Sequence, residues 1–258
     1  MKNKPAPFLR ATDLTYSYAQ TNGRSVEVLD SLSFSIDEGE FITFFGPNGS
    51  GKTTVLNLLS GIDQPTSGTI TINGKNPAEN KVGFVFQNYN ESLFPWRTAK
   101  ENIEFALEIR KVDSVTRRGV ADALLEKVGM TEYKDTHLYE LSGGQKQLIA
   151  IWRAFAYEPD LFLMDEPFSA LDYSTTRKME LELLYMWKDS PKTTLFDSHD
   201  VDEAIFLADR IVVLSKRPAK IKGVITIDLP RPRKMEMVTS KKFFEIRVKV
   251  LELFEDEN

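Results

Sequence analysis

The chain alternates between short apolar runs and longer segments whose apolar residues recur at helical spacing. Apolar or alternating runs bounded by turn residues predict strands. These runs lie at 8–16, 32–36, 41–45, 69–72, 82–86, 161–164, 193–196 and 211–214. Turns are marked by Asn22-Gly23, Glu38-Gly39 and Asn73-Gly74. Because strands separated by helices favour parallel pairing, the pattern predicts a mainly parallel sheet covered by helices.

Helices are predicted between and after these runs. One begins at Lys52 and stops at Gly61, a residue type that suits a helix end. Residues 98–128 predict further helices, from the spacing of Ile103, Ala106, Leu107, Leu124, Leu125 and Val128. Residues 217–233 contain three prolines and are expected to be extended. A last helix over about 240–254 places Phe243, Arg247 or Val250, and Phe254 near one stripe, which we expect to pack on the domain.

The composition is that of an ordinary globular protein. Of the 258 residues, 41% are hydrophobic and 28% are charged, which excludes a disordered, collagen-like or disulfide-framework chain. The length is enough for one compact unit with its own core. The chain has no cysteine, which excludes thiolate metal sites and cysteine nucleophiles. No stretch resembles a signal peptide or a spanning helix, so we expect a chain that is soluble by itself.

The charge balance argues against one class of partner. The chain has 33 basic and 38 acidic residues, a net charge of −5, and an acidic chain is a poor general binder of nucleic acid. No nucleic-acid partner is therefore expected. Residues 216–258 hold eleven basic and seven acidic side chains, an excess that we interpret as a solvated face rather than a lipid-binding patch.

A glycine-rich segment between the strand at 41–45 and the helix at Lys52 carries the strongest chemical signal. It fits the pattern G-x-x-x-x-G-K-[ST] and is followed by Thr54. Glycines let backbone N–H groups turn toward phosphate oxygens, and the helix N-terminus adds its positive end. Lys52 would reach the β- and γ-phosphates, and Thr53 would ligate Mg²⁺. The loop consists of Gly46, Pro47, Asn48, Gly49, Ser50, Gly51, Lys52 and Thr53.

Two further segments gain meaning beside this loop. The strand at 161–164 runs into Asp165, placed to hold Mg²⁺ through water, and Glu166, placed to polarise an attacking water. The sequence Leu141-Ser142-Gly143-Gly144-Gln145 precedes a helix over about 144–157. Its serine and two glycines at a helix start indicate a second anion site. Read alone, the segment is better explained by Ser142 acting as an ordinary helix cap.

Together the three segments resemble the ATP-binding subunit of ABC transporters, over nearly the whole chain. The resemblance implies an α/β fold of the P-loop NTPase type, with a mainly parallel core, an antiparallel β subdomain and a helical subdomain. It implies one domain over 1–258, with the helical subdomain inserted at about 88–157 and a C-terminal extension at about 216–258. It also implies that ATP and Mg²⁺ are the cofactors, and that the segments are a Walker A loop, an LSGGQ signature and a Walker B strand.

The resemblance assigns the remaining site residues. It implies that Glu166, His199 and Gln87 are catalytic and that Thr53, Gln87 and Asp165 hold the metal. Ser169-Ala170-Leu171-Asp172 matches the D-loop, and Tyr18 matches the aromatic residue that stacks on adenine, with Tyr16 as a rival. The implied nucleotide contacts are Tyr18, Gly46, Pro47, Asn48, Gly49, Ser50, Gly51, Lys52, Thr53, Thr54, Ser142, Gly143, Gly144, Gln145 and Asp172.

The chain departs from the family pattern at three places. Lys146 stands where arginine is commoner, and Trp152 interrupts a helix that usually carries small residues. Asp197 precedes Ser198 and His199 where an apolar residue and a threonine are commoner. We expect Asp197 to be an exposed residue at the end of its strand. The alternative is a carboxylate near the γ-phosphate that shifts the protonation of His199.

The resemblance also implies partners. Two cassettes, either a homodimer or a paralogous pair, would close head to tail around ATP, so that the loop of one faces the Ser142-Gly143-Gly144 turn of the other. Gln87 would pass the change to a helical region that grips two membrane-spanning permease subunits, and indirectly a periplasmic or extracellular solute-binding protein. The expected location is peripheral, on the cytoplasmic face of the membrane. The rivals are an ATPase of DNA repair or chromosome organisation, disfavoured because no long heptad run separates the motifs, and a two-cassette translation ATPase, disfavoured because there is one Walker A.

Three short segments narrow the branch of the family. They are Leu93-Phe94-Pro95-Trp96-Arg97-Thr98 with Glu101-Asn102, Leu214-Ser215-Lys216-Arg217-Pro218, and Asp228-Leu229-Pro230-Arg231-Pro232-Arg233. They resemble importer ATPases of the nitrate, sulfonate, taurine and bicarbonate group, which implies uptake of a small anion. An importer of a small nitrogenous metabolite, such as a pyrimidine precursor, is the alternative. Pro95 and Trp96 predict a stiff apolar knob for a permease helix, with a buried core role for Trp96 as the alternative.

Overall fold

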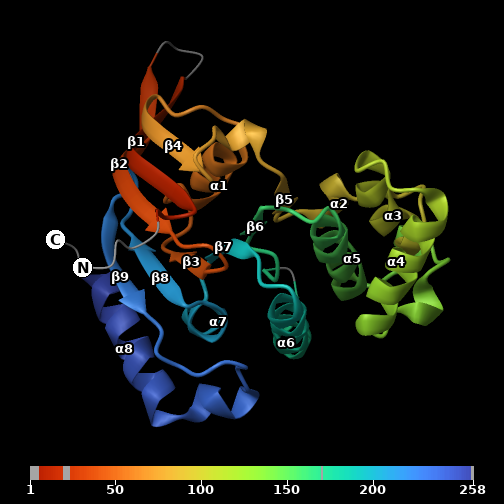
Figure 1. The fold of residues 1–258 in the computed structure, drawn as a ribbon. Coiled ribbons are helices and arrows are strands. Elements are labelled where there is room, and N and C mark those ends of the chain that lie inside the picture. The colour runs from red at the N-terminus through yellow and green to blue at the C-terminus, as the bar shows by residue number, and fades with distance from the viewer. Residues whose placement is uncertain (1–5, 20–23, 170, 257–258) are drawn as a thin grey trace.

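The computed structural model describes residues 6–19, 24–169 and 171–256, which form two sheets with helices around them (Figure 1). The larger sheet has the strand order β5-β6-β7-β3-β8-β9, and the smaller sheet has the order β2-β1-β4. The structure confirms the expected α/β fold, with a mainly parallel core and an antiparallel β subdomain. Within the described ranges, no helix is both long and apolar enough to cross a membrane.

The larger sheet places the ends of several strands side by side. Its strands are β5 (Val82–Val85), β6 (Leu161–Asp165), β7 (Thr193–Ser198), β3 (Phe41–Phe45), β8 (Arg210–Leu214) and β9 (Ile221–Thr226). Neighbours pair in parallel except β8 and β9, which are antiparallel. The strands β3, β6 and β7 are buried throughout, as expected for apolar runs covered on both faces. The segment 217–233, expected to be extended, contributes β9.

The smaller sheet is antiparallel, with β1 (Leu9–Ala19) between β2 (Ser25–Ile36) and β4 (Ser67–Ile72). The strand predicted at 32–36 is too short, because β2 begins at Ser25. Its first half is only partly buried and has no continuous apolar run, so the hydrophobic pattern did not reveal it. This half is a strand because it pairs with the end of β1, at Tyr18↔Val26. The predicted turn Asn22-Gly23 lies outside the described residues.

The helices gather in separate regions around the large sheet. They are α1 (Lys52–Ser60), α2 (Tyr89–Ser92), α3 (Ala99–Ile109), α4 (Ser114–Lys127), α5 (Gly143–Ala156), α6 (Tyr173–Asp189), α7 (Val201–Leu207) and α8 (Lys241–Glu255). Short 3₁₀ turns lie at Pro77–Glu79, Thr131–Tyr133, Leu138–Glu140 and Met235–Thr239. Figure 1 shows α2 to α5 beyond the β5 end of the large sheet, away from the antiparallel sheet.

The predicted helix boundaries have clear physical causes. The bounds of α1 agree with the prediction, and Gly61 caps it in the left-handed region at φ 78°. The predicted helical region 98–128 divides into α3 and α4, because Asp113 begins a new helix by accepting hydrogen bonds from Val115 N and Thr116 N. A capping box on Thr98 and Glu101 fixes the start of α3.

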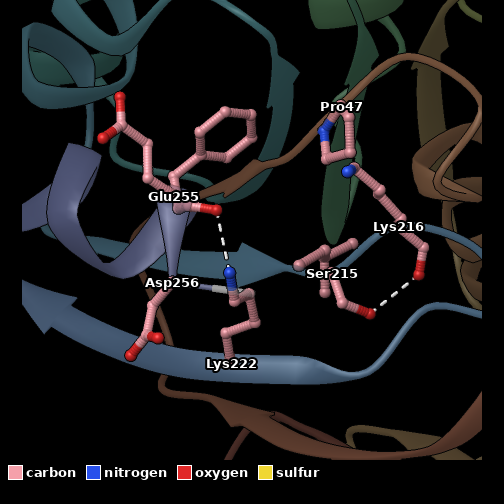
Figure 2. A pocket seen from close by; sticks show the side chains of 8 residues that line it. Pro47, Ser215, Lys216, Lys222, Glu255 and Asp256 are labelled. Carbon is pink, nitrogen blue, oxygen red and sulfur yellow. Dashed lines mark hydrogen bonds between the residues drawn. The ribbon is translucent and has the colours of Figure 1, made fainter. Parts of the chain in front are cut away.

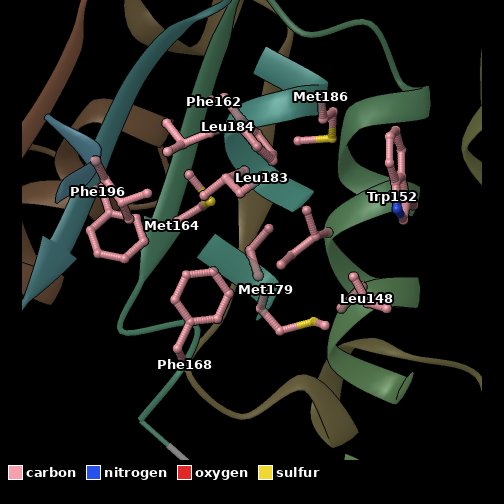
Figure 3. Close-up of a cluster of buried hydrophobic side chains, with 14 of the residues drawn as sticks. Leu148, Trp152, Phe162, Met164, Phe168, Met179, Leu183, Leu184, Met186 and Phe196 are labelled. Carbon is pink, nitrogen blue, oxygen red and sulfur yellow. The ribbon is translucent and has the colours of Figure 1, made fainter. Parts of the chain in front are cut away.

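The core joins the large sheet to the helices that follow it. Figure 3 shows Phe162 and Met164 of β6 facing Met179 and Leu183 of α6, with Trp152 on the neighbouring α5. All of these side chains are buried. Trp152, which departs from the family pattern, is therefore a core residue of α5, and its ring packs edge-on against that of Phe155 at 5.5 Å.

The last helix packs on the domain, as predicted. Phe243, Ile246 and Val250 of α8 are buried, and the ring of Phe254 lies 5.1 Å from that of Phe45 in β3. Arg247, which the stripe left as an alternative to Val250, instead pairs with Asp202 of α7 at 2.5 Å. The chain end is thereby attached to the helix that follows β7 and His199.

Candidate functional site

The glycine-rich loop connects β3 to α1 and bends tightly around the Lys52 ammonium. Lys52 Nζ donates to Gly46 O at 3.0 Å and to Pro47 O at 3.2 Å. Gly51 precedes α1 at φ 108°, and a Cβ there would lie 2.8 Å from Val28 Cγ1. No other residue type fits that position, since both the backbone angle and the space require glycine. The loop therefore presents the first N–H groups of α1 toward the site.

The carboxyl end of β6 meets this loop. Thr53 Oγ1 donates to Asp165 Oδ1 at 3.1 Å, so the first hydroxyl of α1 and the last residue of β6 share one position. Burial raises the pKa of Asp165, while its hydrogen bonds to Asp197 and Thr53 lower it. Hydroxyl and carboxylate oxygens are the donors that Mg²⁺ prefers, so this pair fits the metal that the sequence predicted.

Glu166, directly after β6, joins three segments of the chain. Its Oε2 accepts from Gln87 Nε2 at 3.3 Å and lies 3.0 Å from His199 Nδ1, while its Oε1 lies 3.9 Å from Lys52 Nζ. Glu166 has φ 39°, a left-handed value that is uncommon for residues other than glycine. Such conformations concentrate at functional sites, where the surrounding structure holds them.

The structure corrects the expectation for Asp197. It was expected to be an exposed strand-end residue, but it is 1% exposed, and its Oδ1 lies 3.7 Å from Lys52 Nζ. The reason is that β7 continues to Ser198 between two partners, so Asp197 pairs with Asp165 on one side and Phe44 on the other. Burial raises the pKa of Asp197 well above its usual range, opposed by the charge of Lys52.

A cavity of about 400 Å³ lies over these residues. Its lining includes the loop, Gln87, Glu166 and Asp197, and at the side of the small sheet Tyr18, Val28 and Arg217. Sequence reasoning gave no role to Val28 or Arg217. Val28 belongs to no motif, and the segment 214–218 that contains Arg217 was assigned no contact with the site, because β2 and the turn after β8 reach the loop only through the fold.

Tyr18 lies at the mouth of this cavity. It is 43% exposed, and its hydroxyl lies 3.3 Å from Thr54 Oγ1, just inside α1. Tyr16, the rival for the adenine contact, packs edge-on against Tyr18 at 4.9 Å between ring centroids and is not among the described residues that line the cavity. The geometry favours Tyr18 as the ring that a base would meet.

The second glycine-containing turn, at the start of α5, lies apart from this cavity. Ser142 caps α5 and forms a capping box with Gln145, and Gly143 and Gly144 are the first two residues of the helix. Asp172 caps α6 by accepting hydrogen bonds from Ser174 and Thr175. Among the described residues lining the cavity, none comes from either helix start. Ala170, part of the predicted D-loop, lies outside the described residues.

Comparisons with known proteins agree on one family. The family model described as ABC transporter matches residues 29–169. An uncharacterized ABC transporter ATP-binding protein of Methanocaldococcus jannaschii is 42% identical, over 96% of this chain and 92% of its own. The nitrate import ATP-binding protein NrtD of Synechocystis sp. is 42% identical, over 86% of this chain and 83% of its own. The aliphatic sulfonates import ATP-binding protein SsuB of Bacillus cereus is 40% identical, over 92% of each chain.

Solved structures agree with this result. The dimeric structure of MJ0796, a bacterial ABC transporter cassette, has a TM-score of 0.74 at 30% identity and covers 86% of this chain. A second structure, of its post-hydrolysis state bound to ADP and Pi, matches equally well. Both cover their own chains fully. Since the family model, the relatives and the solved structures all coincide, the chain belongs to the ABC transporter family.

Proposed function

We propose that this chain is the ATP-hydrolysing subunit of an importer, and that it powers uptake of a small anion such as nitrate, a sulfonate, taurine or bicarbonate. One observation carries the proposal. Glu166 Oε2 is shared by Gln87 and His199, at 3.3 and 3.0 Å, beside a phosphate-type loop that holds Lys52. Relatives that import nitrate, aliphatic sulfonates and bicarbonate support the transport role.

The loop residues bind the phosphates of ATP. Lys52 donates to two backbone carbonyls of its own loop, and phosphate oxygens are stronger acceptors for the same ammonium. The N–H groups of the 46–51 loop and the start of α1 supply further donors. Thr53, Asp165 and Gln87 would hold Mg²⁺, which when bound neutralises charge on the β- and γ-phosphates.

Glu166 prepares the water that attacks the γ-phosphate. Its carboxylate accepts a proton from that water, while Gln87 and His199 keep its Oε2 in one orientation. Because the transition state is loose, most of the rate gain comes from this positioning and from the charges of the loop.

A second cassette completes the site. The start of α5 has the positive end of a helix, with Gly143 and Gly144 as its first two residues, yet among the described residues it does not line the cavity of its own chain. Placed over the ATP of another cassette, this helix start supplies further positive potential and N–H donors for the phosphates. Asp172, the cap of α6, lies near it, because Leu171 and Thr175 are the neighbours of Gly144. ATP therefore joins the two cassettes, as a homodimer or a paralogous pair, and hydrolysis releases them.

The helical region contacts the permease. Trp96 is 70% exposed, contrary to the alternative that it is a core residue. The buried side chain of Asn102 fixes the segment around Trp96. It accepts a hydrogen bond from Phe94 N at 2.9 Å and donates to Phe94 O and Thr98 O. A rigid, exposed aromatic residue on a fixed turn is typical of an interface anchor.

The assembly follows from these contacts. Two permease subunits would span the membrane, with the cassettes on their cytoplasmic face and a periplasmic or extracellular solute-binding protein on the other side. The chain serves as one ABC ATPase domain over 1–258, in which about 88–157 form the helical subdomain and about 216–258 a C-terminal extension.

The substitution Glu166→Gln tests the enzymatic part. It keeps the shape of the side chain and removes the proton acceptor, so hydrolysis should fall about 10²–10⁴-fold while ATP binding remains. The variant should accumulate as an ATP-bound dimer, measured by light scattering after size-exclusion chromatography. Lys52→Ala is the matched control, which should lose ATP binding and therefore the dimer. A Glu166→Gln cassette that hydrolyses ATP at the wild-type rate would remove Glu166 from this role.

Uptake in a deletion strain tests the transport part. Nitrate, an alkyl sulfonate, taurine and bicarbonate are offered as labelled solutes, with the Glu166→Gln gene as the inactive control. Loss of uptake of one of them, restored only by the wild-type gene, supports the anion assignment. Normal uptake of all four contradicts it, and loss of a nitrogenous metabolite instead would redirect the substrate and leave the ATPase assignment standing.

A further inference from the structure

The turn after β8 brings a second cation to the nucleotide cavity. Arg217 lines this cavity together with Tyr18, Val28 and the loop around Lys52. In the sequence it lies beyond His199, at the start of the C-terminal extension. Nothing in the motifs of the site assigns a role to it.

The turn is fixed on both sides. Ser215 Oγ donates to Lys216 O at 2.8 Å and accepts from Lys220 N at 2.9 Å, which closes the turn on itself. Buried Ala219 then pairs with β2, since its N donates to Val28 O at 2.8 Å and its O accepts from Asp30 N at 3.0 Å. Arg217 is thus carried by a turn with a defined backbone rather than by a free loop.

The turn also lies against the far side of the phosphate loop. Figure 2 shows Ser215 and Lys216 beside Pro47, in a neighbouring cavity of about 520 Å³ that is also lined by the end of α8. The hydrogen bond from Lys222 Nζ to Phe254 O, at 2.8 Å, attaches that helix end to β9. Two successive side chains of the turn therefore flank the loop, Lys216 on one side and Arg217 on the other.

The guanidinium is tethered at one nitrogen and keeps donors to spare. Arg217 Nε donates to Glu27 O at 3.1 Å, on the strand that also carries Val28. An arginine has five N–H donors, so four remain for a ligand. Val28 itself touches the loop at Gly51, which places this end of β2 against the nucleotide-binding backbone.

The two cations of the cavity mark two different ends of it. Lys52 is buried beside Glu166 and Asp197, the end at which the γ-phosphate is cleaved. Arg217 is bonded to Glu27 of β2, which pairs with the end of β1 that carries Tyr18, so it belongs to the small-sheet end of the cavity, the end left for the nucleoside. Resting on the proposed ATPase function, we infer that Arg217 binds the adenosine end of the nucleotide, by hydrogen bonds to the α-phosphate or ribose or by stacking on the base. The C-terminal extension thereby contributes directly to ATP affinity.

The inference predicts loss of affinity without loss of chemistry. Arg217→Ala should raise KM for ATP about five- to tenfold with kcat unchanged, because an exposed charge-assisted hydrogen bond contributes modestly. The dissociation constants of ATP and ADP, measured by calorimetry, should rise by the same factor, since the two nucleotides share this end. Arg217→Lys keeps the charge but loses the forked guanidinium, so its KM and dissociation constants should lie between those of the wild type and Arg217→Ala.

The control comes from the same turn. Lys220 pairs with Asp30 at 2.9 Å and does not line the cavity as described, so Lys220→Ala should leave both nucleotide affinities unchanged. Melting of each variant without nucleotide verifies the fold, and Arg217→Lys serves if the alanine variant is unstable. Unchanged ATP and ADP affinities in Arg217→Ala, or a fall in kcat with unchanged KM, would overturn the inference. The proposed function would still stand if the wild-type cassette hydrolyses ATP. A wild-type cassette that binds no ATP would instead refute that function.

Discussion

Single side chains in this site owe their chemistry to burial among other charges. Asp165, Glu166 and Asp197 surround the one ammonium of Lys52, at 3.9 Å for Glu166 and 3.7 Å for Asp197. Burial raises the pKa of Asp197 most, and the nearby charge of Asp165 raises it further. Asp165 and Asp197 are paired residues of β6 and β7, so the raised pKa of Asp197 favours the form that can donate a hydrogen bond to the Asp165 carboxylate.

This arrangement makes a prediction for two substitutions of Asp197. Asparagine can still donate a hydrogen bond to Asp165, so Asp197→Asn should keep kcat within about threefold. Leucine cannot, and Asp197→Leu should lower kcat about tenfold or more, since a hydrogen bond to a charged group contributes about 1.5–3 kcal/mol. Steady-state ATPase rates at saturating ATP provide the measurement. Equal rates in the two variants would show that the hydrogen bond to Asp165 does not matter for turnover.

At the scale of elements, helix starts fix the functional loops. The first turn of α7 holds the segment that carries His199, because Asp200 accepts from Asp202 N and Glu203 N, and Ser198 Oγ is bonded to Glu203. The start of α3 does the same for Trp96, through Thr98 and Asn102. In both cases a loop residue is placed by the capping of the helix that follows it.

The segment before α3 can be tested apart from the ATPase site. Trp96→Ala should leave the ATPase rate of the isolated cassette within about twofold, because Trp96 is not among the described residues that line the nucleotide cavity. It should weaken co-purification with the permease and solute uptake about tenfold or more, the usual cost of losing an aromatic anchor. Phe244→Ala, which removes a 59% exposed aromatic residue from α8, is the control and should change neither. Permease binding that survives Trp96→Ala would place the contact elsewhere.

At the scale of the whole molecule, stability depends on charges buried between α6 and α7. Glu180 and Glu203 are both buried; Arg177 binds both oxygens of Glu180, and Glu203 is hydrogen-bonded to Ser198. Burial raises the pKa of Glu180 to about 7 and that of Glu203 to about 8. Since these values exceed those of the unfolded chain, the folded state holds more protons than the unfolded state in between. The free energy of unfolding therefore falls as pH rises from about 4.5 toward 8.

Removing this charge should flatten the pH dependence. Glu203→Gln stays neutral at every pH and can still bond to Ser198, so its melting temperature should exceed that of the wild type at pH 8 and approach it near pH 5. For a domain of this size, 1 kcal/mol corresponds to about 2–4 °C. Calorimetry across pH 5–8.5 measures the difference in melting temperature between variant and wild type. Glu245→Gln, at an exposed residue of α8, is the control. A difference that is constant over this range would mean that Glu203 titrates normally in the folded protein.

The sequence by itself determined what is local in the chain. The strand, the glycine-rich loop and α1 are continuous, so the order of apolar run, glycines, Lys52 and Thr53 specifies their geometry without help from elsewhere. The end of α1 at Gly61 and the caps at Asp113 and Ser142 have the same local origin.

Tertiary structure alone decided what depends on neighbours distant in the sequence. Asp197 is buried because β7 lies between β6 and β3, whereas an isolated strand end would expose it. The first half of β2 is a strand because β1 pairs with it, although it has no apolar run of its own. Arg217 reaches the nucleotide cavity because its turn docks on β2, some distance from every motif of the site. Pattern and spacing report the forces within one segment, while burial and charge in a site are set by the segments that the fold places against it.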